Sequence, residues 1–256
     1  MRRGKIERAP NPKGVGRSGR RIQTFKEFAV HDDACGMKVG TDALLLGGWA
    51  GGTAEDDGRR VKTILDIGTG SGILALMLAQ RFPEAKVDAI ELEPEAAQQA
   101  QDNVKRSPYT DRIHVHVRAV QGWDTRVDLV VCNPPFFHGH PKSADRKRNL
   151  ARHDDTLPLR TLLRAAKACL NEGGEFAMVF SEDRANELIA TAEEEGLHLH
   201  TKVALRATSA HDVIRSLWSW RLHPSSRTTY DTWEIEGPKG QGEWSATVQA
   251  LLSPFV

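Results

Sequence analysis

The chain has 256 residues, 39% of them hydrophobic, and a formal net charge of only +1 at neutral pH. This length allows one large α/β domain with a substantial core. No apolar run approaches the roughly 18 residues of a membrane span, and the N-terminus lacks the apolar segment of a signal peptide, so we expect a soluble, cytoplasmic protein with no membrane partner. The three cysteines lie too far apart for a disulfide framework or a zinc site, and the histidines form no metal-type cluster, so no metal is expected.

Positive charge is concentrated at the N-terminus. Residues 1–21 carry eight lysines and arginines against one acid, Glu7, in a stretch rich in glycine and proline. This composition is typical of a disordered arm, which either binds a polyanion or remains a solvated tail. We therefore expect a basic, disordered arm over residues 1–22 and a single domain over residues 23–256.

Strand and helix patterns alternate along most of the domain. Residues 24–39 are expected to be extended or turn-rich, and Thr41 or Asp42 can cap a short helix that ends at Trp49. Strands are then predicted at 61–67, 86–92, 112–118, 127–132 and 175–180, and helices at 72–82, 94–106, 159–170 and 183–195. Two strands without a helix between them follow at 197–205 and 213–222, then a short strand at 232–235 and a helix from about 243 to 252.

Alternating strands and helices indicate a parallel sheet with helices on both faces. The two late strands, which lack a helix between them, predict one antiparallel strand near an edge. The expected fold is therefore α/β, with a seven-stranded, Rossmann-like, mostly parallel sheet.

A glycine-rich string, Asp66-Ile67-Gly68-Thr69-Gly70-Ser71-Gly72, joins the first of these strands to its helix. This is where a doubly wound sheet binds a nucleotide-like ligand, and the three glycines allow a tight turn and close approach of a ligand. A dinucleotide needs a pyrophosphate seat at the helix N-terminus. S-adenosylmethionine has no phosphate, and its ammonium and sulfonium charges suit the carboxylate of Asp66.

The next predicted strand ends in acids. An acid at this position can accept hydrogen bonds from both hydroxyls of a ribose. We expect Glu91 in this role because it directly follows the apolar run. Glu93 is the alternative, although a favourable charge at a helix N-terminus is the simpler explanation for it.

A second string, Asn133-Pro134-Pro135-Phe136, ends the strand predicted at 127–132. The Asn133 side-chain oxygen and the Pro134 carbonyl can accept both N–H bonds of a conjugated amine, which localises the nitrogen lone pair. The prolines fix the backbone, and Phe136 can stack on a base. Catalysis would then depend on positioning and electrostatics. Without its place at a strand end, the string would indicate only a turn.

A long polar segment follows, over residues 137–158. A loop of this length inside a domain is usually functional or mobile. It carries a basic run that is expected to hold the phosphates beside an unpaired or flipped-out base, with a solvated loop as the alternative. The run consists of Lys142, Arg146, Lys147, Arg148 and Arg152.

Taken together, these motifs resemble the bacterial tRNA adenine-N6 methyltransferases that modify adenine-37, beside the anticodon of valine tRNA. The resemblance rests on residues 25–28, 35–42, 66–72, 74–81, 88–93, 133–136 and 151–152 and on the C-terminal helix. It implies the class I methyltransferase fold, S-adenosylmethionine as donor, S-adenosylhomocysteine as product and tRNA as partner, with no obligate protein partner evident.

The resemblance also implies roles for particular residues. Donor-site residues carry over to Asp66, Gly68, Gly70 and Glu91, with Gly72 in the same turn, and the acceptor motif carries over to residues 133–136. In such folds the segment before the first strand often folds over the donor. Lys38 and Thr41 are therefore candidate donor contacts, or else a surface lysine and a helix cap.

Two positions depart from the family pattern. Similar enzymes commonly carry an Asp after the third strand that holds the adenine amine of the donor, whereas residues 118–123 here contain no acid. Either Gln121 or a backbone carbonyl is expected to take that role, or the affinity for the donor is expected to be lower. Phe136 stands where Tyr is frequent, and residues 136–138 are also similar to enzymes that methylate guanine N2 in ribosomal RNA. The alternatives are therefore methylation of guanine N2 in ribosomal RNA, methylation of a glutamine amide in a release factor, and a non-catalytic RNA-binding role.

Overall fold

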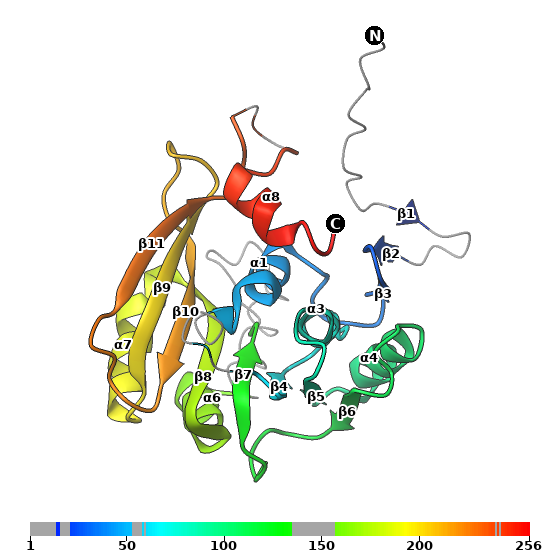
Figure 1. The fold of residues 1–256 in the computed structure, drawn as a ribbon, viewed down its shortest axis with the longest axis horizontal. Helices are drawn as coiled ribbons and strands as arrows, with labels where there is room; N and C mark the ends of the chain where they lie inside the picture. Colours follow the sequence, from blue (N-terminus) through cyan, green and yellow to red (C-terminus); the bar gives the residue numbers. More distant parts are fainter. Residues whose placement is uncertain are drawn as a thin grey trace, which may run out of the picture.

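A computed structural model describes residues 14–15, 21–52, 58, 60–134, 157–238, 240 and 242–256. A large sheet lies at the centre of the molecule (Figure 1). Its strands are β4 (Thr63–Ile67), β5 (Lys86–Glu91), β6 (Ile113–Val117), β7 (Val127–Cys132), β8 (Leu170–Ser181), β9 (His198–Arg206), β10 (Arg215–Arg221) and β11 (Thr229–Glu234).

The strand order is β11-β9-β10-β8-β7-β4-β5-β6. Strand β10 runs antiparallel to both β8 and β9, as the missing helix between the two late strands predicts. The sheet has one strand more than the seven expected, because β11 adds to its edge in parallel with β9. The sequence indicated this short strand but not its place in the sheet.

Helices cover both faces of the sheet. One face carries α1 (Thr41–Trp49), α3 (Ile73–Arg81), α4 (Pro94–Lys105) and α8 (Ala246–Leu252), and the other carries α6 (Leu159–Ala168) and α7 (Ala185–Glu194). Since successive strand residues point to opposite faces, neighbours in one strand enter different cores. Leu129 and Val131 of β7 pack in the first core, whereas Val130 and Cys132 pack in the second.

The N-terminal region forms a small antiparallel sheet of β1 (Gly14–Val15), β2 (Arg21–Thr24) and β3 (Ala29–His31). The domain boundary expected at residue 22 falls inside β2. Residues 1–13 and 16–20 of the predicted arm lie outside the described residues.

The predicted cap of α1 is wrong. Thr41 is already the first helical residue, so the N-cap is Gly40, which is extended and has no side chain to form a cap hydrogen bond. The Asp42 carboxylate instead forms an ion pair with Arg215, at 2.6 Å between Oδ1 and Nε. Among the described residues, no helix is long and apolar enough to cross a membrane.

Candidate active site

The carboxyl ends of the parallel strands meet at one edge of the sheet, where ligands of open α/β sheets bind. At this edge Ile67 of β4 pairs with Ile90 of β5 on one side and with Cys132 of β7 on the other. The next residues along the three strands are Gly68, Glu91 and Asn133. Three motifs far apart in the sequence are therefore neighbours at the strand ends.

The glycine turn has a backbone that other residues adopt only with strain. Gly68, Gly70 and Gly72 have φ values of 72°, 55° and 82°, in the left-handed region that favours glycine. A Cβ added to Gly68 or Gly70 would meet nothing within 4 Å, whereas one on Gly72 would lie 3.4 Å from the Ala100 side chain of α4. Space over the first two glycines is thus open to a ligand, and Gly72 serves the packing of two helices.

Asp66 lies beneath this turn and is fully buried. Its Oδ2 accepts a hydrogen bond of 2.6 Å from the Thr69 hydroxyl, and the Ala75 amide also acts on the carboxyl as a hydrogen-bond donor. Burial raises the pKa of Asp66 to about 7, against the opposing effect of the Thr69 hydrogen bond. A cation bound at the turn would favour the ionised carboxylate, since an opposite charge nearby lowers the pKa of an acid.

Glu91 closes the turn from the neighbouring strand. Its Oε2 accepts from the Gly70 amide at 2.9 Å, and its Oε1 accepts from the amides of Leu92 and Glu93 at 2.8 and 3.0 Å. Glu93 is exposed, and its side chain caps no amide of α4. The geometry therefore favours Glu91 over Glu93 as the acid that faces a ligand on the turn.

The segment before α1 lies beside this turn. Lys38 donates from Nζ to the backbone carbonyls of Asp32 and Asp33, at 2.5 and 3.4 Å. Asn103 of α4 donates to the carbonyls of both His31, in front of this segment, and Ser71 of the turn, each at 2.8 Å. Thr41 is the first residue of α1. The donor contacts expected of Thr41 and Lys38 stay predictions.

Only half of the acceptor motif lies in the described part of the chain. Asn133 and Pro134 directly follow β7 and are half-buried. Pro135, Phe136 and the whole basic run, Lys142, Arg146, Lys147, Arg148 and Arg152, lie outside the described residues.

Two apolar side chains at this edge were missed by the sequence analysis. Leu92, which directly follows Glu91, is 46% exposed, and Val117, which pairs with Glu91 at the end of β6, is 51% exposed. Large apolar side chains on the surface often mark binding sites when they gather. The signal that could have found Leu92 is an apolar residue placed between two acids at a strand end.

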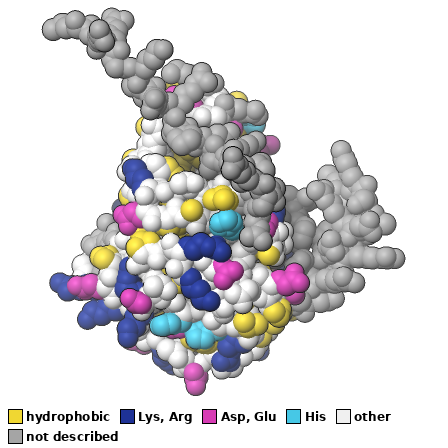
Figure 2. Space-filling view, turned by 90° about the vertical axis from the view of Figure 1, so that its right-hand side faces the viewer, with side chains coloured by type: hydrophobic (Ala, Val, Ile, Leu, Met, Phe, Trp, Pro, Cys, Tyr) yellow, Lys and Arg dark blue, Asp and Glu magenta, His cyan; other side chains and the backbone are white. Residues whose placement is uncertain are grey.

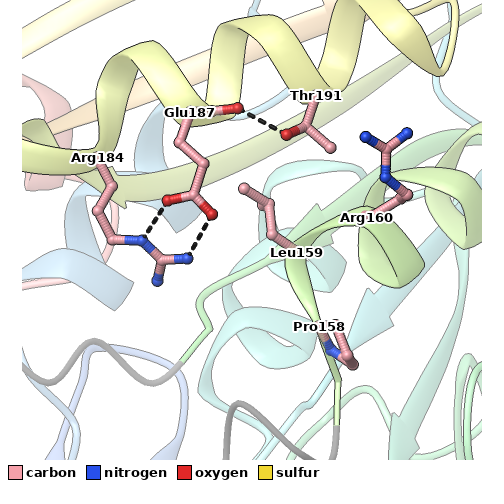
Figure 3. A pocket seen from close by; sticks show the side chains of 6 residues that line it. All are labelled: Pro158, Leu159, Arg160, Arg184, Glu187 and Thr191. Carbon is pink, nitrogen blue, oxygen red and sulfur yellow. Dashed lines mark hydrogen bonds and ion pairs between the residues drawn. The ribbon is translucent and has the colours of Figure 1, made fainter.

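A separate cavity of about 360 Å³ lies between the start of α6 and α7. Figure 3 shows its lining, where Arg184 forms two hydrogen bonds of 2.8 and 2.9 Å with Glu187. Arg160 binds Glu195 at 2.9 Å and also contacts Glu194. The pairs of Arg160 join α6 to the end of α7, and the pair of Arg184 joins α7 to the 3-10 turn before it. The charged groups that line the cavity therefore already have structural partners. Among the described residues, no group of three or more His, Cys, Asp or Glu side chains could hold a metal ion.

Comparisons with known proteins agree with this geometry. A family model described as methyltransferase small domain matches residues 54–192. Two curated relatives, both named tRNA1(Val) (adenine(37)-N6)-methyltransferase, come from Escherichia coli O157:H7 and Salmonella arizonae and are 44% and 45% identical to this chain. Each alignment covers 91% of this chain and 93% of the relative.

Solved structures show the same fold at low sequence identity. A protein titled a predicted O-methyltransferase, from Agrobacterium tumefaciens, superposes with a TM-score of 0.61 at 21% identity, over 84% of this chain and 96% of its own. An S-adenosylmethionine-dependent methyltransferase from Clostridium acetobutylicum gives a TM-score of 0.53 at 12% identity, over 71% and 92% of the two chains. These two likenesses concern the fold alone.

Proposed function

The chain belongs to the family of the tRNA1(Val) (adenine(37)-N6)-methyltransferases, and on this premise we propose that it methylates N6 of adenine-37 in valine tRNA, with S-adenosylmethionine as donor. The observation that carries the proposal is the position of Asn133, which follows β7 beside the glycine turn. The residue proposed to hold the target amine and the turn proposed to bind the charged donor thus follow neighbouring strands.

On the donor side, each group has a distinct task. Asp66 supplies negative charge beneath the turn, and the open backbone of Gly68 and Gly70 lets the donor approach. Glu91 accepts hydrogen bonds from the ribose, and the exposed side chain of Leu92 offers an apolar surface to the donor's adenine. Contact between this surface and a planar ring is favourable, because it removes apolar area from water.

On the acceptor side, the chemistry needs no strong base. Two N–H bonds of the target amine donate to the Asn133 side-chain oxygen and the Pro134 carbonyl, so the nitrogen lone pair turns toward the methyl carbon. The C–N bond forms as the C–S bond breaks, its electron pair stays on sulfur, and the amine afterwards loses a proton to water. Such catalysis works by orientation and fixed dipoles.

Phosphate contacts are assigned in this proposal to the basic run at 142–152. The face that carries α4 and β6 shows basic and acidic side chains interspersed (Figure 2). A mixed surface of this kind attracts a polyanion weakly compared with a clustered basic loop. With tRNA as its proposed substrate, the protein is also proposed to act in the cytoplasm.

The test uses unmodified valine tRNA, labelled donor and identification of the methylated nucleoside. We expect N6-methyladenosine with the wild type and loss of at least two orders of magnitude in rate with Asn133→Ala, at unchanged donor affinity by calorimetry. Methylguanosine, or methylation of a protein glutamine, would replace the proposed acceptor. Donor binding failure with retained RNA binding would indicate a non-catalytic protein, and a normal rate for Asn133→Ala would contradict the clamp.

A further inference from the structure

Two side chains of α4 bind the segment in front of α1, and one of them, Asn103, also binds the glycine turn. Asn103 is fully buried. Its Nδ2 donates to the carbonyls of His31 and Ser71, both at 2.8 Å, and its Oδ1 accepts from the His31 amide at 3.0 Å. One amide group therefore ties β3 to the turn, and all of its hydrogen-bonding groups are used.

Gln99 lies one helical turn before Asn103 and so faces the same side. Its Oε1 accepts from the Ala34 amide at 2.9 Å and from the Cys35 thiol at 3.1 Å, and its Nε2 donates to Asp33 Oδ1 at 2.8 Å. Three consecutive residues of the segment are thus fixed to the helix by one side chain.

The remainder of the segment is closed internally. Asp32 Oδ2 accepts from the Val39 amide at 3.0 Å and from Gln23 Nε2 at 3.2 Å. Residues 31–39 consequently form an ordered loop whose one side is attached to α4. Because Asn103 binds both His31, at the start of this loop, and Ser71 of the glycine turn, the loop stands next to the donor side of the active site.

We propose that Gln99 and Asn103 are positioning residues of the donor site. They hold the glycine turn and the loop 31–39 in one arrangement before the donor arrives, so they set donor affinity and not the rate of methyl transfer. Prearranged groups bind more tightly because less ordering remains to be done on binding. The inference rests on the proposed function only in taking S-adenosylmethionine as the ligand.

Gln99→Ala is the main test, since its side chain is partly exposed and its loss leaves the core intact. The matched control is Gln98→Ala, on the exposed side of α4, where Gln98 donates to Asp102 Oδ1 of the same helix at 3.1 Å. We expect Gln99→Ala to raise the calorimetric Kd for S-adenosylhomocysteine and the KM for the donor by about tenfold, the scale of one hydrogen bond. The kcat at saturating donor should stay within about twofold, and the control should match the wild type.

A charge swap separates this role from a general loss of stability. Gln99→Glu puts a carboxylate against Asp33 and should weaken donor binding further, whereas the pair Gln99→Glu with Asp33→Asn restores a donor–acceptor contact and should recover binding to within about threefold of the wild type. Asn103→Ala is expected to lower Tm instead, because it leaves buried backbone groups unpaired.

The proposal is overturned if Gln99→Ala binds S-adenosylhomocysteine like the wild type, if kcat falls while Kd stays constant, or if the double variant binds no better than Gln99→Glu. The calorimetric experiment contains no RNA. An error in the proposed tRNA acceptor would therefore leave its result unchanged, and the two proposals fail separately.

Discussion

The buried carboxyl of Asp66 should make the stability of the ligand-free protein depend on pH in a defined direction. Its pKa is raised from 3.8 to about 7, chiefly because burial penalises the charged form. Below pH 3.8 the group is protonated in both the folded and the unfolded state and contributes nothing. As the pH rises toward 7, the unfolded chain releases the proton first, so unfolding becomes progressively easier.

The size of this effect follows from the two pKa values. Each pKa unit corresponds to about 1.4 kcal/mol, so the interval up to about 7 corresponds to a loss of about 4 kcal/mol in the free energy of unfolding above neutral pH. That is a large part of the stability of a typical domain. Ionisation of Asp66 therefore destabilises the ligand-free protein. A cation bound at the glycine turn would offset this loss.

Asp66→Asn isolates the effect, because the amide has a similar shape and does not titrate. Urea unfolding of both proteins at pH 4, 6 and 8 gives the difference in free energy at each pH, and contributions from histidines cancel in that difference. We expect the variant to gain about 4 kcal/mol relative to the wild type between pH 4 and 8. Parallel pH profiles for the two proteins would refute the reasoning.

Three further predictions concern the glycine turn and the C-terminal end of α3. Thr69→Val removes the hydroxyl donor of the Asp66 carboxylate and should cost about 1 kcal/mol more at pH 8 than at pH 5, measured by urea unfolding; an equal cost at both would contradict this. Gly70→Ala should destabilise by about 1–2 kcal/mol because its φ is positive, whereas Gly36→Ala, in equally open space without a positive φ, should be neutral or slightly stabilising; similar Tm values for both would show that conformation is not the cause. Arg112→Lys should lower the free energy of unfolding by about 2 kcal/mol, because its guanidinium binds three backbone carbonyls at the end of α3; an unchanged urea midpoint would argue against that role.

Local patterns predicted the elements that frame the site. The strand expected at 127–132 matches β7 residue for residue, because an apolar run ends there at a polar residue followed by prolines. The glycine turn could also be predicted from the sequence, because its positive φ values favour glycine. The choice of Glu91 over Glu93 rests on the position of each acid relative to the apolar run and stays a prediction.

Features that depend on distant residues left no local pattern. Asn103 is 72 residues from His31, and Gln99 is 64 residues from Cys35, so nothing near either amide indicates its partners. The pairing of β11 with β9 is of the same kind, because an edge strand is placed by the sheet that receives it. The N-cap of α1 was predicted wrongly for another reason. Thr41 and Asp42 are residue types that often cap helices, whereas Gly40 holds the extended N-cap backbone here without a side chain.

The loop after β6 shows how the chain can manage without the acid that similar enzymes carry there. Arg118 donates from Nε to the Ala119 carbonyl and from Nη2 to the Gly122 carbonyl, at 3.2 and 3.0 Å, and lies 5.5 Å from the centre of the Trp123 ring. The carbonyl that follows Ala119 accepts from the Trp123 amide. Three carbonyls of the loop thus accept hydrogen bonds within it, while the Gln121 side chain is exposed. That Gln121 or a backbone carbonyl meets the donor's adenine amine stays a prediction. A neutral amide on a braced loop would bind the donor's adenine amine by a hydrogen bond alone, and the carboxylates of Asp66 and Glu91 would then carry all the charge recognition at this edge.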